Sequence, residues 1–148
     1  MASRDLKDAH KELRDAFDTL SYRFSAWFPG WNLIVVTTYR SPEEQAVEFR
    51  AGRSRLDGTV KKSHHNVKPS NALDVMIVAP GGQLLDSLYA NGKVSREQMF
   101  SMYGLFGVWA QRLGLRWGGD WDSDGLHVVP DPDESLNDPY HIELRRNV

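Results

Sequence analysis

One acidic residue interrupts an otherwise apolar stretch of this 148-residue chain. Residues 72–79 read Ala-Leu-Asp-Val-Met-Ile-Val-Ala and end at Pro80-Gly81-Gly82, a pattern typical of a buried β-strand. Asp74 places a carboxylate inside that strand. An unpaired buried charge is strongly unfavourable, or is removed by protonation. The folded chain must therefore supply Asp74 with a cation, an arginine or backbone donors.

The first third of the chain predicts a helix, a strand and a second helix. An amphipathic helix is expected over residues 5–28, ending before Pro29-Gly30, because apolar side chains recur every three or four positions. A β-branched run over 31–39 predicts a strand, and Ser41-Pro42-Glu43-Glu44 has the residues that start a helix. Arg40 then lies at a strand-to-helix corner. The helical stripe comprises Leu6, His10, Leu13, Phe17, Leu20, Phe24 and Trp27.

The rest of the chain predicts another helix and two further strands. Segment 53–68 is polar and basic without periodicity and is expected to be a long loop, which in compact domains is often functional. Ser95 opens a helix that runs to Leu113. Short strands are expected at 115–117 and 140–144, the latter with His141 and Glu143 on opposite or alternating faces, and a loop at 118–136. This order predicts an α+β fold with a small, mainly antiparallel sheet and flanking helices.

Composition favours one compact domain spanning residues 1–148. A hydrophobic content of 41% is enough to bury a sizeable core. The net charge of −2 argues against a nucleic-acid partner or an anionic membrane, and no apolar run approaches the length of a membrane span or a signal peptide. We expect a protein made in the cytoplasm without an export signal. One locally basic segment either meets an anionic polymer or is a solvated loop; it contains Arg50, Arg53, Arg55, Lys61, Lys62 and Lys68.

The chain has no cysteine, so any metal must be held by histidine, aspartate and glutamate. His65, Asp74 and His141 offer two imidazoles and a carboxylate, which hold Zn²⁺ on three sides and leave the fourth for water. Asp138, three residues before His141, can take a proton from that water. A mixed set without thiolate makes zinc the default ion. These residues predict a hydrolytic zinc site.

Four sequence blocks run in one order from Thr38 to Glu143, about two-thirds of the chain. They are Thr38-Tyr39-Arg40-Ser41-Pro42-Glu43-Glu44-Gln45; Ser63-x-His65 with Ala72-x-Asp74; Leu113-Gly114-Leu115-x-Trp117-Gly118-Gly119-Asp120-Trp121; and Asp138-x-x-His141-x-Glu143. Each block alone is weak, but together they resemble the zinc peptidoglycan peptidases. That family holds the D-alanyl-D-alanine carboxypeptidases and the L-alanyl-D-glutamate endopeptidases of bacteriophage endolysins.

The resemblance implies a role for each matched residue. His65, Asp74 and His141 would bind zinc, Asp138 would act as general base, and Arg40 would bind substrate and stabilise the oxyanion. The residues expected to contact substrate are Gln45, Ser63, Asp120 and Trp121. The substrate would be the stem peptide of bacterial peptidoglycan. The protein would be a monomeric endolysin without a separate wall-binding domain, released from the host cytoplasm to act on the wall. The bond cleaved, the wall chemotype and the host stay open.

Simpler interpretations exist for these residues. His65 could be a surface histidine, His141 a core histidine and Asp138 the cap of a turn, while Asp74 could pair with Arg40 or a lysine. His64 either faces solvent or supports a ligand from behind, and His10 and His127 are assigned to the core or the surface. Trp117 could belong to the core. The competing function is a non-catalytic module on the same fold that binds peptidoglycan or a protein and has a structural metal site.

The chain departs from the family's commonest pattern at two places. His65 and Asp74 stand nine positions apart, two more than usual, and Lys68-Pro69-Ser70 occupies the place of a single glycine. We interpret this as a two-residue loop insertion ahead of the strand. Pro139 also lies one position earlier than the usual proline, so that Tyr140 precedes His141. The ligand geometry requires the surrounding backbone to absorb both changes.

Overall fold

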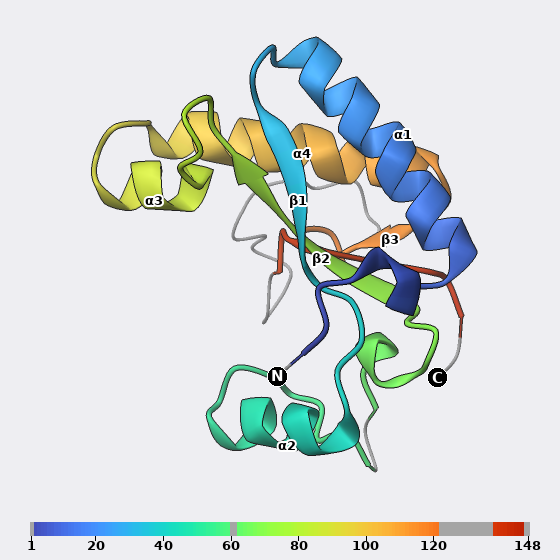
Figure 1. The fold of residues 1–148 in the computed structure, drawn as a ribbon. Helices are drawn as coiled ribbons and strands as arrows, with labels where there is room; N and C mark the ends of the chain where they lie inside the picture. The colour runs from blue at the N-terminus through green and yellow to red at the C-terminus, as the bar shows by residue number, and fades with distance from the viewer. Residues whose placement is uncertain (1, 60–61, 122–137, 147–148) are drawn as a thin grey trace.

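The fold is α+β, as predicted, and is built on one antiparallel sheet. The computed structural model describes residues 2–59, 62–121 and 138–146. Within them the strand order is β1-β2-β4-β3, so the strand formed last in the chain lies between two earlier ones (Figure 1). The strands are β1 (Asn32–Thr37), β2 (Ala72–Val78), β3 (Arg116–Trp117) and β4 (His141–Glu143).

The longest two helices pack together against the sheet. α1 contacts β1 and α4, and α4 also contacts β3. The helix α2 lies apart from them at the opposite end of the molecule (Figure 1). The helices are α1 (Lys11–Trp27), α2 (Pro42–Arg50), α3 (Leu85–Ala90) and α4 (Arg96–Arg112), with 3-10 turns η1 (Leu6–Asp8) and η2 (His64–Asn66).

The N-terminal helix expected over residues 5–28 is divided into η1 and α1. Ala9 between them forms an isolated parallel bridge with Ser70, and the backbone N–H of His10 donates to the Ser70 carbonyl at 2.9 Å. These contacts need an extended backbone, which local periodicity cannot reveal. The prediction of one continuous helix was therefore wrong at its start.

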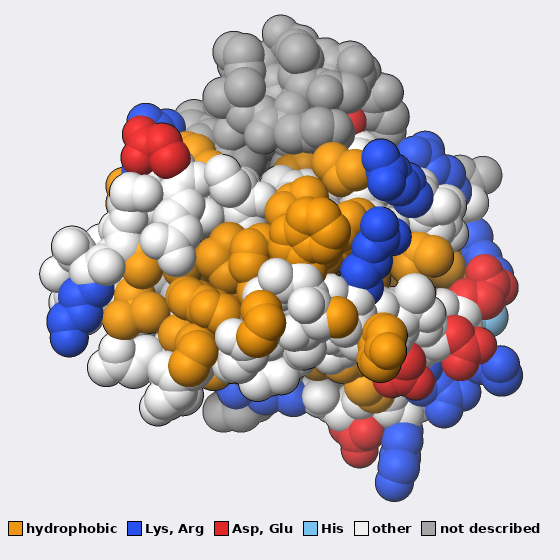
Figure 2. Space-filling model, turned by 90° about the horizontal axis from the view of Figure 1, so that it is seen from above, with side chains coloured by type: hydrophobic (Ala, Val, Ile, Leu, Met, Phe, Trp, Pro, Cys, Tyr) orange, Lys and Arg blue, Asp and Glu red, His pale blue; other side chains and the backbone are white. Residues whose placement is uncertain are grey.

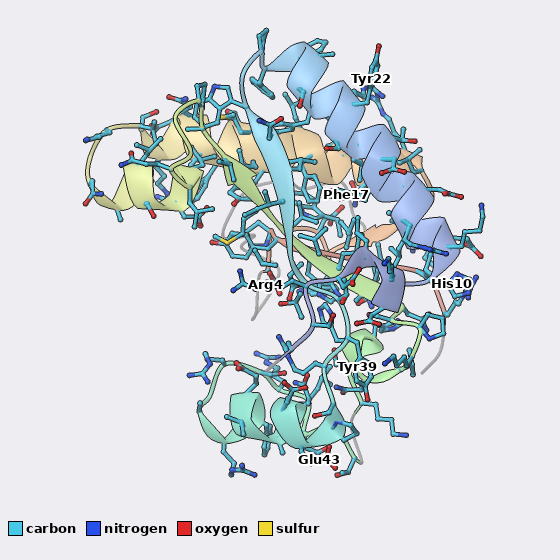
Figure 3. The ribbon with its side chains drawn as sticks, in the orientation of Figure 1. Arg4, His10, Phe17, Tyr22, Tyr39 and Glu43 are labelled. Atoms are coloured by element: carbon cyan, nitrogen blue, oxygen red, sulfur yellow. The ribbon has the colours of Figure 1, made fainter. Side chains whose placement is uncertain are left out.

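The predicted apolar stripe of α1 is largely buried, but its last residue is not. Leu13, Leu20 and Phe24 are almost fully buried, whereas Trp27 is 62% exposed. Tyr22, on the outer side of the helix, points away from the sheet (Figure 3). Figure 2 views the molecule from the end at which α1 terminates. Hydrophobic side chains gather on this face.

The alternation of side chains along β2 separates the core from the face that carries Asp74. Leu73, Val75 and Ile77 are fully buried and belong to the hydrophobic core shared with α1 and α4. Asp74 and Met76, which point the other way, are only partly buried. Asp74 is thus held by a rigid strand but projects from the face away from the core.

Two local features were not expected from sequence. The loop after Pro80-Gly81-Gly82 contains the short helix α3, and the predicted loop 53–68 contains η2. From residue 122 on, the loop predicted at 118–136 lies outside the described residues, as does His127. No helix in the described part of the chain is long and apolar enough to cross a membrane.

Candidate metal centre

The register of the sheet brings Asp74 and His141 together. Strands β2 and β4 pair so that these two residues are direct cross-strand partners, and their side chains lie on the same face. Nδ1 of His141 is 3.2 Å from Oδ1 of Asp74. A carboxylate and an imidazole from distant parts of the chain are therefore placed side by side by backbone pairing.

His65 reaches the same place from η2, which is bonded to the corner after β1. The backbone N–H of Arg40 donates to the His65 carbonyl at 2.9 Å, and Asn66 Nδ2 donates to the Arg40 carbonyl at 2.8 Å. Nδ1 of His65 lies 2.6 Å from the Thr38 carbonyl oxygen. A carbonyl can only accept, so Nδ1 carries a proton. The Nε2 of a neutral His65 then presents its lone pair.

The donor atoms around Asp74 suit a cation. Nε2 of His65 is buried and has no hydrogen-bonding partner in the described structure, although Oδ2 of Asp74 lies only 3.2 Å away. The two atoms face each other across a gap that either a proton on Nε2 or a metal ion bound to both would satisfy. One ligand atom from each of His65, Asp74 and His141 lies within 4.8 Å of the others. Two imidazoles and one carboxylate form a donor set suited to zinc.

The longer spacing between His65 and Asp74 does not prevent this convergence. The buried Ser70 donates its hydroxyl to the Thr38 carbonyl at 2.8 Å, and its backbone N–H donates to the Asp8 carbonyl at 2.7 Å. Asn71 N–H donates to the His64 carbonyl at 3.0 Å. The additional residues thus pack against η1 and the end of β1, which is how the backbone absorbs them.

Glu143 supports His141 from behind and was missed as a functional residue. Its Oε1 lies 2.7 Å from Nε2 of His141, and its Oε2 lies 3.1 Å from Nε2 of His64. The prediction that His141 and Glu143 lie on opposite or alternating faces was wrong, because residues two apart on a strand share a face. That spacing was the signal that could have identified Glu143. Of the two alternatives for His64, exposure to solvent or support of a ligand, the structure agrees with the second, because His64 contacts the carboxylate that holds His141.

The electrostatics reflect this packing of carboxylates and imidazoles. Burial alone would raise the pKa of Asp74, but the adjacent His65 and His141 hold it well below its usual range. Burial opposes charging of His141, yet its bonds to Asp74 and Glu143 raise its pKa to about 10. The pKa of His64 is lowered by burial. The centre attracts positive charge strongly.

Asp138 is held beside the centre by β3 and the turn that precedes β4. Its N–H donates to the Gly118 carbonyl at 2.9 Å, and Gly118 N–H donates to the His141 carbonyl at 2.8 Å. A Cβ on Gly118 would lie 2.1 Å from the Asp138 carbonyl oxygen, so only glycine permits this approach. Burial, and then the negative charge of Asp74, raise the pKa of Asp138. It is a carboxylate with increased proton affinity.

The backbone around Pro139 is fixed by side chains from three other elements. Trp117 Nε1 donates to the Pro139 carbonyl at 2.9 Å. The hydroxyls of Tyr140 and Tyr103 donate to the two carboxylate oxygens of Asp86, at 2.5 and 2.7 Å. Asp86 belongs to α3, so this unexpected helix helps to position the residue next to His141. The changed proline position is accommodated in this way.

Arg40 and Gln45 form a connected pair at the cleft wall. Nη1 of Arg40 donates to Oε1 of Gln45 at 3.1 Å, and Nη2 lies 4.0 Å from Oδ2 of Asp74. The fully buried Gln45 uses its amide nitrogen to donate to Ser54 Oγ at 2.8 Å and the Leu56 carbonyl at 2.9 Å. Both the salt bridge considered for Asp74 and the corner position of Arg40 are thus present.

The other residues predicted to contact substrate have different surroundings. Ser63 lines the cleft but also caps η2, because its hydroxyl accepts from His65 N–H at 3.1 Å. Trp121 lines the cleft, with its ring 5.2 Å from that of His141. Asp120 is 1% exposed, accepts from Gln111 Nε2 at 2.9 Å, and is not among the described residues that line the cleft. A substrate contact for Asp120 stays a prediction.

A cleft of about 480 Å³ opens onto these groups. The sheet contributes Asp74, His141 and Glu143 to its lining, and Asp138 also lines it. The opposite wall comes from α2 and the segment 53–56. The cleft therefore exposes a candidate metal centre, a carboxylate of raised proton affinity and several guanidinium groups to one bound molecule.

Comparison with known proteins establishes the fold. No protein-family model matches the chain, and no curated protein matches it by sequence. Among solved structures, it is similar to the crystal structure of the Serratia marcescens L-Ala D-Glu endopeptidase ChiX, with a TM-score of 0.59 and 24% identity. The match covers 97% of this chain and 88% of that chain.

Proposed function

We propose that the protein is a zinc-dependent peptidase that hydrolyses the stem peptide of bacterial peptidoglycan. The observation that carries the proposal is the convergence of His65, Asp74 and His141, with the buried Nε2 of His65 facing a carboxylate oxygen. The similar fold of a protein described as an L-Ala D-Glu endopeptidase supports the same assignment. His65, Asp74 and His141 hold the ion. Zinc, when bound, supplies Lewis-acid chemistry for peptide hydrolysis.

The side chains around that centre have separate tasks. Asp138, whose pKa is raised by burial, accepts a proton from the attacking water and returns it to the leaving amine. Arg40 donates hydrogen bonds to the developing oxyanion, in an orientation that Gln45 maintains. Glu143 fixes the ring of His141. The ring of Trp121 lies next to the imidazole of His141.

We assign the protein to the endolysins of bacteriophages, as the sequence resemblance implies, and expect it to act as a monomer. Cleavage between L-alanine and D-glutamate is the favoured reaction, because the similar solved structure bears that description. Cleavage between the two terminal D-alanines is the alternative. A non-catalytic binding module does not account for Asp138, since peptide binding alone requires no carboxylate of raised proton affinity at the metal centre.

Mass spectrometry of muropeptides released from purified peptidoglycan tests the proposal. The zinc-loaded protein should release fragments from one defined bond, a chelator should abolish the release, and added zinc should restore it. Asp138→Ala should be inactive but still bind zinc. The proposal fails if the zinc-loaded protein cleaves no stem peptide, or if chelation leaves cleavage unchanged.

A further inference from the structure

We infer that Arg55 is a specificity-determining residue that binds a free carboxylate of the peptide in the cleft. This inference rests on the proposed function and assigns a role to the basic segment after α2. Arg55 lines the cleft on the wall opposite the sheet and is exposed to solvent. Figure 1 shows that α2 and the chain that follows it lie apart from α1, α3 and α4.

The backbone that carries Arg55 is fixed on both sides. Gln45 Nε2 donates to Ser54 Oγ and to the Leu56 carbonyl, the residues immediately before and after it. Leu56 N–H also donates to Ser54 Oγ at 3.1 Å. Gly58, at φ +89°, packs so closely that a Cβ would lie 2.8 Å from the Pro42 carbonyl oxygen. Arg55 is therefore presented by an ordered turn tied to α2.

The same buried amide connects Arg55 to the catalytic side of the cleft. Oε1 of Gln45 accepts from Arg40, while its Nε2 holds the turn at Arg55. One side chain thus holds both the guanidinium of Arg40 and the backbone that carries Arg55. Such an arrangement suits a ligand with two polar groups a fixed distance apart, namely a reacting carbonyl and a carboxylate.

Arg55 differs from the other arginines of the cleft in having no described partner. Arg53 donates to both carboxylate oxygens of Glu48, at 2.6 and 3.4 Å. Arg116 donates to the Trp121 carbonyl and lies 3.8 Å from Glu143 Oε2. Among the described residues, Arg55 makes no hydrogen bond or ion pair.

The charge of the cleft points to the same ligand chemistry. Four arginines and four carboxylates occur among its described lining residues, so a bound divalent ion leaves an excess of positive charge. The four carboxylates are Glu48, Asp74, Asp138 and Glu143. An unpaired guanidinium binds carboxylates by two parallel hydrogen bonds. The substrate class is therefore an anionic peptide with a carboxylate away from the scissile bond.

A stem peptide offers that carboxylate from two sources, and the experiment separates them. The probe is the pentapeptide L-Ala-γ-D-Glu-L-Lys-D-Ala-D-Ala, compared with one analogue amidated at the glutamate α-carboxylate and one amidated at the C-terminus. We expect kcat/KM of the zinc-loaded protein to fall at least about tenfold for one of the amides. Arg55→Gln should lower kcat/KM for the parent peptide and remove that preference, while Arg55→Lys should retain part of it.

The matched control is Arg50→Gln, which removes an exposed arginine at the end of α2 that does not line the cleft. It should leave the acid-to-amide ratio unchanged. Calorimetric binding of the three peptides to the metal-free wild type and Arg55→Gln gives a second readout without cleavage, and should show the same preference and its loss. Equal losses for acid and amide peptides, or a wild type without preference, would overturn the assignment of Arg55. Absence of cleavage of all three peptides, with the binding preference intact, would overturn the proposed function alone.

Discussion

Glu143 and His141, two residues apart on β4, are joined by a contact of 2.7 Å between Oε1 and Nε2. A carboxylate accepts, so Nε2 of His141 must carry the proton. This orientation directs Nδ1 of His141 toward Asp74. Glu143 thus selects which ring nitrogen is available to a metal, and His64 contacts its other oxygen.

Replacing Glu143 should therefore weaken metal binding without removing a ligand. We expect Glu143→Gln to reduce zinc affinity about 10- to 100-fold, because the amide no longer enforces the orientation of His141. A competition titration with a chromogenic chelator measures the affinity. Glu97→Gln, at an exposed position in the first turn of α4, is the control and should not change it. Unaltered zinc affinity in Glu143→Gln would contradict the role assigned to Glu143.

Asp138→Asn should inactivate the protein and yet stabilise its metal-free form at neutral pH. Burial raises the pKa of Asp138 in the folded state above the ordinary value of about 3.9. Ionisation is then less favourable in the folded chain than in the unfolded chain, so the charged carboxylate lowers the free energy of unfolding at high pH. This penalty disappears as the pH falls through the folded-state pKa toward the ordinary value.

Urea unfolding of the metal-free Asp138→Asn variant measures this effect. The gain in stability over wild type should be present at pH 7 and vanish below about pH 4. Peptidase activity should fall by a factor of about 10² to 10⁴. Asp18→Asn on the exposed side of α1 should change neither property. Destabilisation of Asp138→Asn at pH 7 would show that its carboxylate is a structural cap.

Gln45→Met should reduce both stability and activity. The substitution keeps the side-chain volume but removes the hydrogen bonds of Gln45 to Ser54 Oγ, the Leu56 carbonyl and Arg40. We expect the free energy of unfolding to fall by about 2–4 kcal/mol. Loss of the link to Arg40 should also lower kcat. Gln98→Met at an exposed position on α4 should cost less than about 0.5 kcal/mol, and an equal cost at Gln45 would refute its linking role.

Two glycines of α4 should respond in opposite ways to alanine. A Cβ on Gly107 would lie 2.1 Å from the ring of the fully buried Trp117, whereas nothing lies within 4 Å of a Cβ on Gly104. Gly107→Ala should destabilise the protein by about 2–3 kcal/mol through overpacking. Gly104→Ala should stabilise it by about 0.5–1 kcal/mol through helix propensity. Thermal unfolding of both variants checks the contrast.

Elements whose signals are local could be predicted from sequence. The capping box at Ser41 with Glu44 is present as predicted, as are the strand around Asp74 and the long helix that follows Ser95. Each depends on residues within a few positions of one another. Features created by tertiary pairing could not be predicted. The bridge from Ala9 to Ser70 that ends η1 is an example, because the two residues are far apart in the chain.

The candidate site likewise contains residues whose place could be predicted from sequence and one whose role could not. The candidate ligands His65, Asp74 and His141 were predicted from residue types and order, and the three side chains do converge. The role of Gln45 could not be recognised. The resemblance implies a substrate contact for Gln45, which stays a prediction, whereas the structure shows its amide bonded to Arg40 and to the turn at residues 54–56. Only the folded structure reveals that the buried side chain of Gln45 links Arg40 to the turn at residues 54–56.

The position of β4 between β2 and β3 has a kinetic consequence. Asp74 and His141 are 67 residues apart in the chain. Their contact forms only when β4, the last strand in the chain, pairs between β2 and β3. Pairings of such long range form slowly, after the loop entropy of the intervening chain has been overcome. A partly folded chain without this strand contains no assembled centre. Assembly of the candidate metal centre and completion of the fold therefore occur in the same event.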